Sequence, residues 1–132
     1  IGIAIRDDVE RAGFTAQMSA TGFPNRDLTE NELAKTHIRH MVGGRSPEVF
    51  REVIYRFWFP ERAGALINFL DAMSENWNIS LFHYRMQGSD YGSVLIGLEI
   101  PPADDAKLLR FLNRLGYRYL DESDNVACRL FM

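Results

Sequence analysis

The stretch FPERAGAL, residues 59–66, combines residue types that could bind an anion at a corner of the chain. Pro60 ends an apolar, strand-like run and restricts the backbone at the turn that follows. Gly64 stands where a helix is expected to begin, and the free N–H groups at a helix N-terminus favour an anion such as a carboxylate. A glycine there could instead serve only to let a strand and a helix pack closely. Both interpretations stay open.

A second candidate lies in NISLFHYR, residues 78–85. Arg85 can pair with a carboxylate through two parallel hydrogen bonds, and Tyr84 has an apolar ring with a hydroxyl tip. Alternation along a strand places Ile79, His83 and Arg85 on one face, and Tyr84 on the other. Tyr84 and Arg85 therefore cannot both contact one ligand from a regular strand, unless a bulge redirects one of them.

Other residues with reactive side chains do not form a recognisable catalytic or metal centre. His37 and His40 are expected on a strand, which would direct them to opposite faces, and no third ligand is evident, so we predict no metal site. Neither Lys35 nor Lys107 has a glycine-rich phosphate-binding loop nearby, and Asp104 suits a helix N-terminus. We predict no catalytic residues and no cofactor bound by this chain.

The composition is that of a globular protein in a reducing compartment. The 132 residues are 46% hydrophobic and 25% charged, which is enough to form a core. A net charge of −3 gives no basic surface for nucleic acid or an anionic membrane. The single cysteine, Cys128, excludes an internal disulfide. We therefore expect a cytoplasmic protein, or a plastid one for a plant source, with neither nucleic acid nor membrane as partner.

From Glu52 onward the hydrophobic pattern predicts strand, helix, strand, strand, helix, strand, the βαββαβ order of ferredoxin-like α+β folds with an antiparallel sheet. The expected ranges are 52–59, 63–75, 78–87, 93–100, 105–115 and 117–121, followed by a short tail at 127–131. The first part of the chain predicts a strand at 1–5, helices at 8–20 and 30–35, and a strand at 37–42. Residues 43–48, GGRSPE, are the expected boundary between two domains, 1–48 and 49–132.

The beginning of the chain repeats its end. IGIAI at residues 1–5 resembles IGLEI at residues 96–100, and each is followed by a helix that ends at a glycine and an aromatic residue. Further matches occur in the same order: Gly22-Phe23 with Gly116-Tyr117, Asp27 with Asp121, Thr29-Glu30-Asn31 with Ser123-Asp124-Asn125, and Arg39 with Arg129. This series predicts one complete unit preceded by the C-terminal half of a similar unit, whose opening elements would lie upstream of Ile1.

Three stretches carry a resemblance to a known family. They are VIYRFWFPERAGALINFLDAM, WNISLFHYRMQGSDYGSVLIGLEI and LNRLGYRYLDESDN. Together they resemble the C-terminal regulatory region of biosynthetic threonine dehydratase (threonine ammonia-lyase). LAKTHIRHMVGGRSP is similar to the segment that joins the two ACT-like subdomains of that family.

The resemblance implies an allosteric module that binds branched-chain amino acids, with isoleucine as inhibitor and valine as its antagonist. The reaction, deamination of threonine with pyridoxal phosphate, would belong to a separate catalytic domain, which would be a partner of this one. Because both faces of the predicted sheet carry apolar residues, we expect its helix-free face to be covered by the sister subdomain, another subunit or the catalytic domain.

The resemblance also places effector response at HYR, residues 83–85, and at Arg39, for which a simple salt bridge is an equally good explanation. The candidate effector-binding residues are Pro60, Glu61, Gly64, Ala65, Leu66, Tyr84, Arg85 and Arg39.

Two other classes of function remain as alternatives. The chain could be a structural module that assembles homo-oligomers without binding an effector, since an incomplete unit exposes strand edges that recruit another chain. It could also be an enzyme on a ferredoxin-like scaffold, which would require a cleft with converging titratable groups that the sequence does not indicate.

Overall fold

The computed structural model describes residues 3, 5–34, 37, 51–86 and 90–132. They form two compact units, Ile1–Asn31 and Glu32–Met132. The sequence prediction placed the domain limit at residues 48/49, beside a stretch outside the described residues, and that limit stays a prediction.

The first unit contains one helix, α1 (Asp8–Ala20), with the bounds that the sequence predicts. Asp7 caps it by accepting a hydrogen bond from the Glu10 N–H, and Gly22 follows its end with φ 82°. The predicted strand at residues 1–5 is wrong for Ile3 and Ile5, which belong to no strand. A strand needs a neighbour for its backbone hydrogen bonds, and the described residues of this unit offer none.

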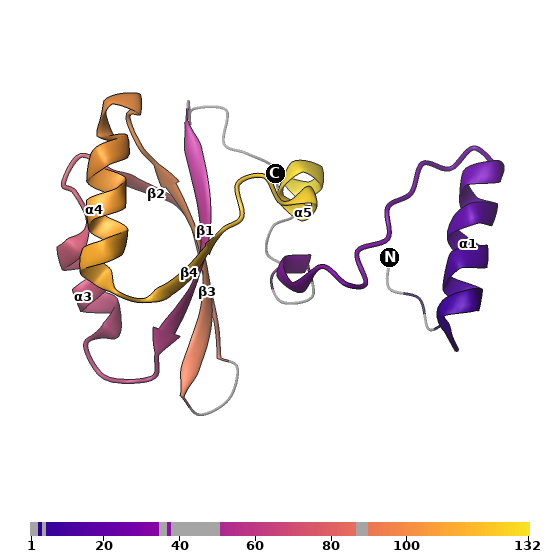
Figure 1. The fold of residues 1–132 in the computed structure, drawn as a ribbon, viewed down its shortest axis with the longest axis horizontal. Helices are drawn as coiled ribbons and strands as arrows, with labels where there is room; N and C mark the ends of the chain where they lie inside the picture. The colour runs from indigo at the N-terminus through magenta and orange to yellow at the C-terminus, as the bar shows by residue number, and fades with distance from the viewer. Residues whose placement is uncertain (1–2, 4, 35–36, 38–50, 87–89) are drawn as a thin grey trace. The chain divides into compact units, whose positions relative to one another are not determined.

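The second unit has a four-stranded antiparallel sheet with the order β2-β3-β1-β4 (Figure 1). Its strands are β1 (Glu52–Pro60), β2 (Asn78–Met86), β3 (Tyr91–Glu99) and β4 (Arg118–Asp121). Its helices are α3 (Ala65–Ala72), η1 (Pro102–Asp104), α4 (Asp105–Leu115) and α5 (Val126–Phe131). The predicted ferredoxin-like α+β fold with βαββαβ order and an antiparallel sheet is confirmed.

Helices α3 and α4 cover one face of this sheet, which we call the core face (Figure 1). Phe57 on β1 and Phe69 on α3 are fully buried there, with ring centroids 5.4 Å apart in an edge-to-face arrangement. Phe69 in turn meets Phe111 of α4 at 5.3 Å. Trp77 lies against Phe111 and donates a hydrogen bond to the Asp104 carboxylate at 3.0 Å. This aromatic cluster fixes both helices on the sheet.

The opposite, second face of the sheet is also covered. Ile54 and Leu95, which lie on it, are completely buried. Helix α5 lies on this side (Figure 1). The turn that leads to α5 is tied to β1 by a buried ion pair, in which Arg56 Nε lies 2.8 Å from Glu122 Oε1. Residues 127–131, expected as a tail, form a helix because the Asn125 side chain caps its N-terminus.

A helical turn at residues 32–34 and 37 belongs to the second unit. It buries Leu33, Ala34 and His37, which have the i, i+4 spacing of one helix face. The strand predicted for residues 37–42 is therefore wrong at His37, and residues 38–42 lie outside the described residues. Hydrogen-bond distances from His37 to Ser93 and His83 place this turn on the second face. The prediction that this face is covered is confirmed, but the prediction that it is free of helices is wrong, because α5 and this turn, both from the same chain, lie on it.

Strand β2 contains a β-bulge at Ser80, and because of it the face predicted for Ile79 is wrong. Ile79 pairs with Leu98 and Leu81 pairs with Gly97, so the extra residue moves Ile79 to the core face, whereas the sequence placed it with His83. Downstream of the bulge Tyr84 pairs with Val94 on the core face, and the strand alternates regularly. The bulge therefore does not bring Tyr84 and Arg85 to the same side.

The repeat seen in the sequence is also present in local geometry. The Asp27 carboxylate accepts a hydrogen bond from the Thr29 N–H at 2.9 Å. Asp121 accepts one from the Ser123 N–H, also at 2.9 Å. The matches continue in order: Asn31 N–H donates to Leu28 O and Asn125 N–H to Glu122 O, while Gly22 and Gly116 both have positive φ. The two stretches thus fold alike locally, as an internal duplication predicts.

Candidate functional site

The turn from β1 to α3 forms the centre of the candidate site. Pro60 is the last residue of β1, and Gly64 precedes α3 with φ 86° and ψ −6°. A Cβ on Gly64 would meet no atom within 4 Å, so its left-handed backbone, not close packing of strand and helix, requires the glycine. No side chain caps α3. The Ala65 N–H donates to Arg62 O at 3.3 Å, and no side chain among the described residues caps the remaining N–H groups of this turn.

Tyr84 reaches this turn from the edge strand β2. Its hydroxyl donates a hydrogen bond to the Glu61 carboxylate, and this bond raises the pKa of Tyr84 above its usual range. The ring lies over Gly92 of β3, where an added Cβ would be 2.4 Å from Tyr84 Cε2. The Glu61 N–H donates to Asp90 O at 2.9 Å, which ties the turn to the start of β3. Glu61 and Tyr84, both predicted site residues, are thus brought together.

The other predicted residues are distributed more widely. Ala65 is buried, and its carbonyl accepts a hydrogen bond from the Tyr117 hydroxyl at 3.1 Å. Leu66 is 44% exposed beside it. Arg85 pairs with Ser93 and lies on the second face, away from the turn. Arg39 lies outside the described residues. Sequence reasoning missed Tyr117 and Gly92. The available signal for Gly92 was a glycine at the second position of a strand, directly after an aromatic residue.

A histidine pair on the second face was also missed. His37 Nδ1 lies 2.6 Å from His83 Nδ1, and His37 Nε2 lies 3.0 Å from Ser93 Oγ. The pair joins the helical turn at residues 32–34 and 37 to the middle of the sheet. Within the described ranges no group of three or more His, Cys, Asp or Glu side chains could hold a metal ion.

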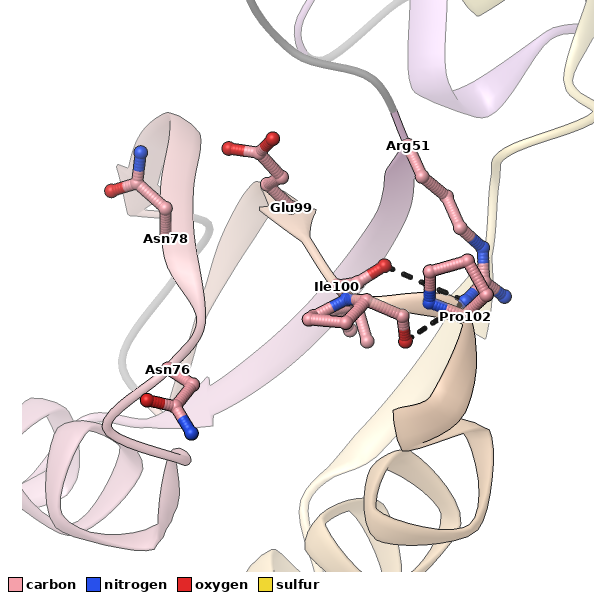
Figure 2. A pocket seen from close by; sticks show the side chains of 7 residues that line it. Arg51, Asn76, Asn78, Glu99, Ile100 and Pro102 are labelled. Atoms are coloured by element: carbon pink, nitrogen blue, oxygen red, sulfur yellow. Dashed lines mark hydrogen bonds between the residues drawn. The ribbon is translucent and has the colours of Figure 1, made fainter.

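The two ends of the sheet each carry a cavity. The smaller, of about 210 Å³, is lined by Arg51, Asn76, Asn78, Glu99 and the Ile100–Pro102 stretch (Figure 2). Its arginine is already occupied, because it donates to the Ile100 and Pro101 carbonyls and to Asp105 at 2.6 Å. The larger cavity, of about 590 Å³, lies where β1 ends and β4 begins, next to the predicted corner.

The fold defines a ferredoxin-like α+β domain of the ACT-like class. Residues 43–132 match the family described as the C-terminal regulatory domain of threonine dehydratase. The chain belongs to this family.

Relatives match over the whole chain or most of it. The chain is 54% identical over all its 132 residues to a biosynthetic L-threonine dehydratase of Burkholderia multivorans. It is 48% identical over 88% of its length to the mitochondrial threonine dehydratase of Saccharomyces cerevisiae, and 44% over 93% to the biosynthetic enzyme of Escherichia coli. It spans about a quarter of the length of these relatives, covering 26%, 20% and 24% respectively.

One relative is named as mitochondrial, and another, from Solanum lycopersicum, as chloroplastic. Among the described residues, no helix has the length and apolar character needed to span a membrane.

Proposed function

We propose that this domain binds isoleucine and valine as allosteric effectors of a pyridoxal-phosphate-dependent threonine dehydratase, with isoleucine inhibiting and valine opposing it. The catalytic domain of that enzyme is the partner on which the module acts, and the assembled enzyme is a homo-oligomer. Family membership supports the regulatory role. The observation that carries the choice of ligand is the corner at Gly64, which offers separate partners for each part of a free amino acid.

A free amino acid requires donors for its carboxylate, an acceptor for its ammonium group and an apolar surface for its side chain. The uncapped N-terminus of α3 supplies N–H donors and a favourable dipole for the carboxylate. The Glu61 carboxylate, oriented by the Tyr84 hydroxyl, is the acceptor for the ammonium group. The exposed side chain of Leu66 and the Tyr84 ring offer apolar surface to a branched aliphatic side chain.

Strand β2 provides a route from this corner to the rest of the protein. Tyr84 contacts the corner on the core face, whereas His83 and Arg85 lie on the second face. His83 contacts His37, which belongs to the helical turn that follows the first unit in sequence. A ligand that shifts Tyr84 moves the neighbouring residues on the other face, and the effector biases the equilibrium by its differential affinity for the two states, typically about 1–3 kcal/mol.

A nuclear magnetic resonance titration of the chain with L-isoleucine and L-valine tests this proposal. We expect the backbone N–H resonances of Gly64–Ile67 and Tyr84 to shift and saturate. Glu61→Gln should weaken binding roughly tenfold, because it removes the charged acceptor for the ammonium group. Glu75→Gln, an exposed carboxylate elsewhere in the same unit, is the matched control and should leave the affinity unchanged.

Shifts confined to residues outside the corner would contradict the site. No shift at all, with the chain forming oligomers, would favour the structural alternative.

A further inference from the structure

The cavity between the end of β1 and the start of β4 combines positive charge with aromatic walls. Two arginines line it, Arg62 from the turn after β1 and Arg118 from β4. None of the described residues that line it is acidic. In the part of the chain that the structure describes, no Asp or Glu forms an ion pair with either arginine. By contrast, Arg51, just before β1, and Arg56, on β1, each have a carboxylate partner, at 2.6 and 2.8 Å respectively.

One arginine is held in place by an aromatic ring. Arg118 and Trp58 are paired across β4 and β1, and the guanidinium carbon lies 4.3 Å from the Trp58 ring centroid. This cation–π contact orients the guanidinium group without neutralising its charge. Its N–H groups remain able to bind an oxyanion in the bidentate geometry that arginine favours.

The walls are aromatic and partly fixed. The cavity is lined by the rings of Trp58, Tyr91 and Tyr117, together with Leu115. The Tyr117 hydroxyl donates to the Ala65 carbonyl at 3.1 Å, which anchors that wall to α3. The volume of about 590 Å³ falls within the roughly 300–1,000 Å³ of small-molecule sites. A ligand with a planar or apolar body therefore fits better than a bare ion.

We propose that this cavity, which shares Pro60 but neither Glu61 nor Tyr84 with the candidate effector corner, is a second binding site for a small molecule that carries a carboxylate or phosphate on a planar or apolar body. Because no carboxylate is among the described residues that line the cavity, an ammonium group would find no charged acceptor there, whereas an oxyanion would meet two guanidinium groups. The ligand class is therefore an anion without a cationic group, which differs from a zwitterionic amino acid. The proposal does not depend on isoleucine or valine binding at the corner.

Titration of the full chain with phenyl phosphate, benzoate and the uncharged benzyl alcohol tests the proposal. The readout is the Trp58 indole N–H resonance, assigned with Trp58→Phe. We expect both anions, or one of them, to shift this resonance in a saturable way, and benzyl alcohol to leave it unchanged. Saturation by phenyl phosphate alone assigns the site to phosphates, and saturation by benzoate alone assigns it to carboxylates.

Arginine variants provide the charge test. Arg62→Gln and Arg118→Gln should each weaken anion binding roughly tenfold, because each removes a charged hydrogen-bond donor. Arg114→Gln is the matched control, since its guanidinium donates to the Asp71 carbonyl of α3 and does not line the cavity. It should change the affinity less than about twofold.

Three results would overturn the proposal: equal binding of benzyl alcohol, an equal loss in Arg114→Gln, or no shift of the Trp58 resonance with either anion. Circular dichroism of each variant verifies that the fold is retained. Failure here would leave the isoleucine proposal unaffected, because the two titrations use different ligands and different reporter residues.

Discussion

The ion pair between Arg56 and Glu122 allows a quantitative test of how the second face is held together. Its atoms are 2.8 Å apart, and the two side chains are only 11% and 8% exposed. Glu122 also accepts a hydrogen bond from Asn125 at 2.6 Å. Glu122→Ala therefore leaves a buried guanidinium group without its carboxylate, a loss that costs about 3–5 kcal/mol for comparable buried pairs.

For a cooperative unit of about 100 residues, each 1 kcal/mol lowers the melting temperature by about 4 °C. We therefore expect Glu122→Ala to lower it by about 12–20 °C in thermal unfolding followed by circular dichroism. The double variant Arg56→Met/Glu122→Leu should recover most of the loss, because an apolar pair needs no desolvation of charge.

The matched control is Asp124→Ala, which removes the ion-pair partner of Arg129. The Asp124 carboxylate lies 2.8 Å from the Arg129 guanidinium group, and the two side chains are 95% and 65% exposed, respectively. That change should cost less than about 1 kcal/mol. If Glu122→Ala were as mild as this control, the ion pair would not hold the α5 turn on the sheet, and our account of the second face would be refuted.

Three further predictions concern the corner, the helical turn and the response to alkali. Gly64→Ala should cost about 1–2 kcal/mol in urea unfolding, because φ is 86° while the added Cβ meets no atom; an unchanged midpoint would show that the turn relaxes freely. Leu33→Ala should destabilise the Glu32–Met132 unit by about 2–5 kcal/mol, since Leu33 is fully buried; a loss below about 0.5 kcal/mol would contradict its place in that unit. Burial, followed by the negative charge of Asp121, raises the pKa of Tyr55 to about 12. Because the unfolded chain then loses its proton more readily than the native one, stability should fall as pH rises from about 10 to 12, and Tyr55→Phe should reduce this slope.

The fold could be predicted largely because its elements have strong local signals. The apolar, aromatic-rich run of β1 and the stripe of leucines on α4 fix their type, and glycine marks both the end of α4 and the start of α3. The bulge at Ser80 has no such signal, so the face of Ile79 was predicted wrongly. His37 was assigned to a strand because nothing local shows that Leu33 and His37 share one buried helical face.

The candidate site could be predicted only in part, for a similar reason. Glu61 and Gly64 are close in sequence, and the turn chemistry of FPERAGAL places them together. The contact between Tyr84 and Glu61 depends on the register of β2 against β3 and on Gly92 leaving room for the ring. The cavity of Arg62 and Arg118 was missed because it forms between β1 and β4, which lie about 60 residues apart in the chain.

Isothermal titration calorimetry of the chain with L-isoleucine tests the central claim most directly, with D-isoleucine as the stereochemical control. The account predicts a saturable heat for the L form, a raised melting temperature in its presence, and in Glu61→Gln a roughly tenfold weaker affinity with a correspondingly smaller thermal shift. Absence of heat and of any thermal shift with L-isoleucine up to about 10 mM, at which even a millimolar affinity would be detected, would contradict it.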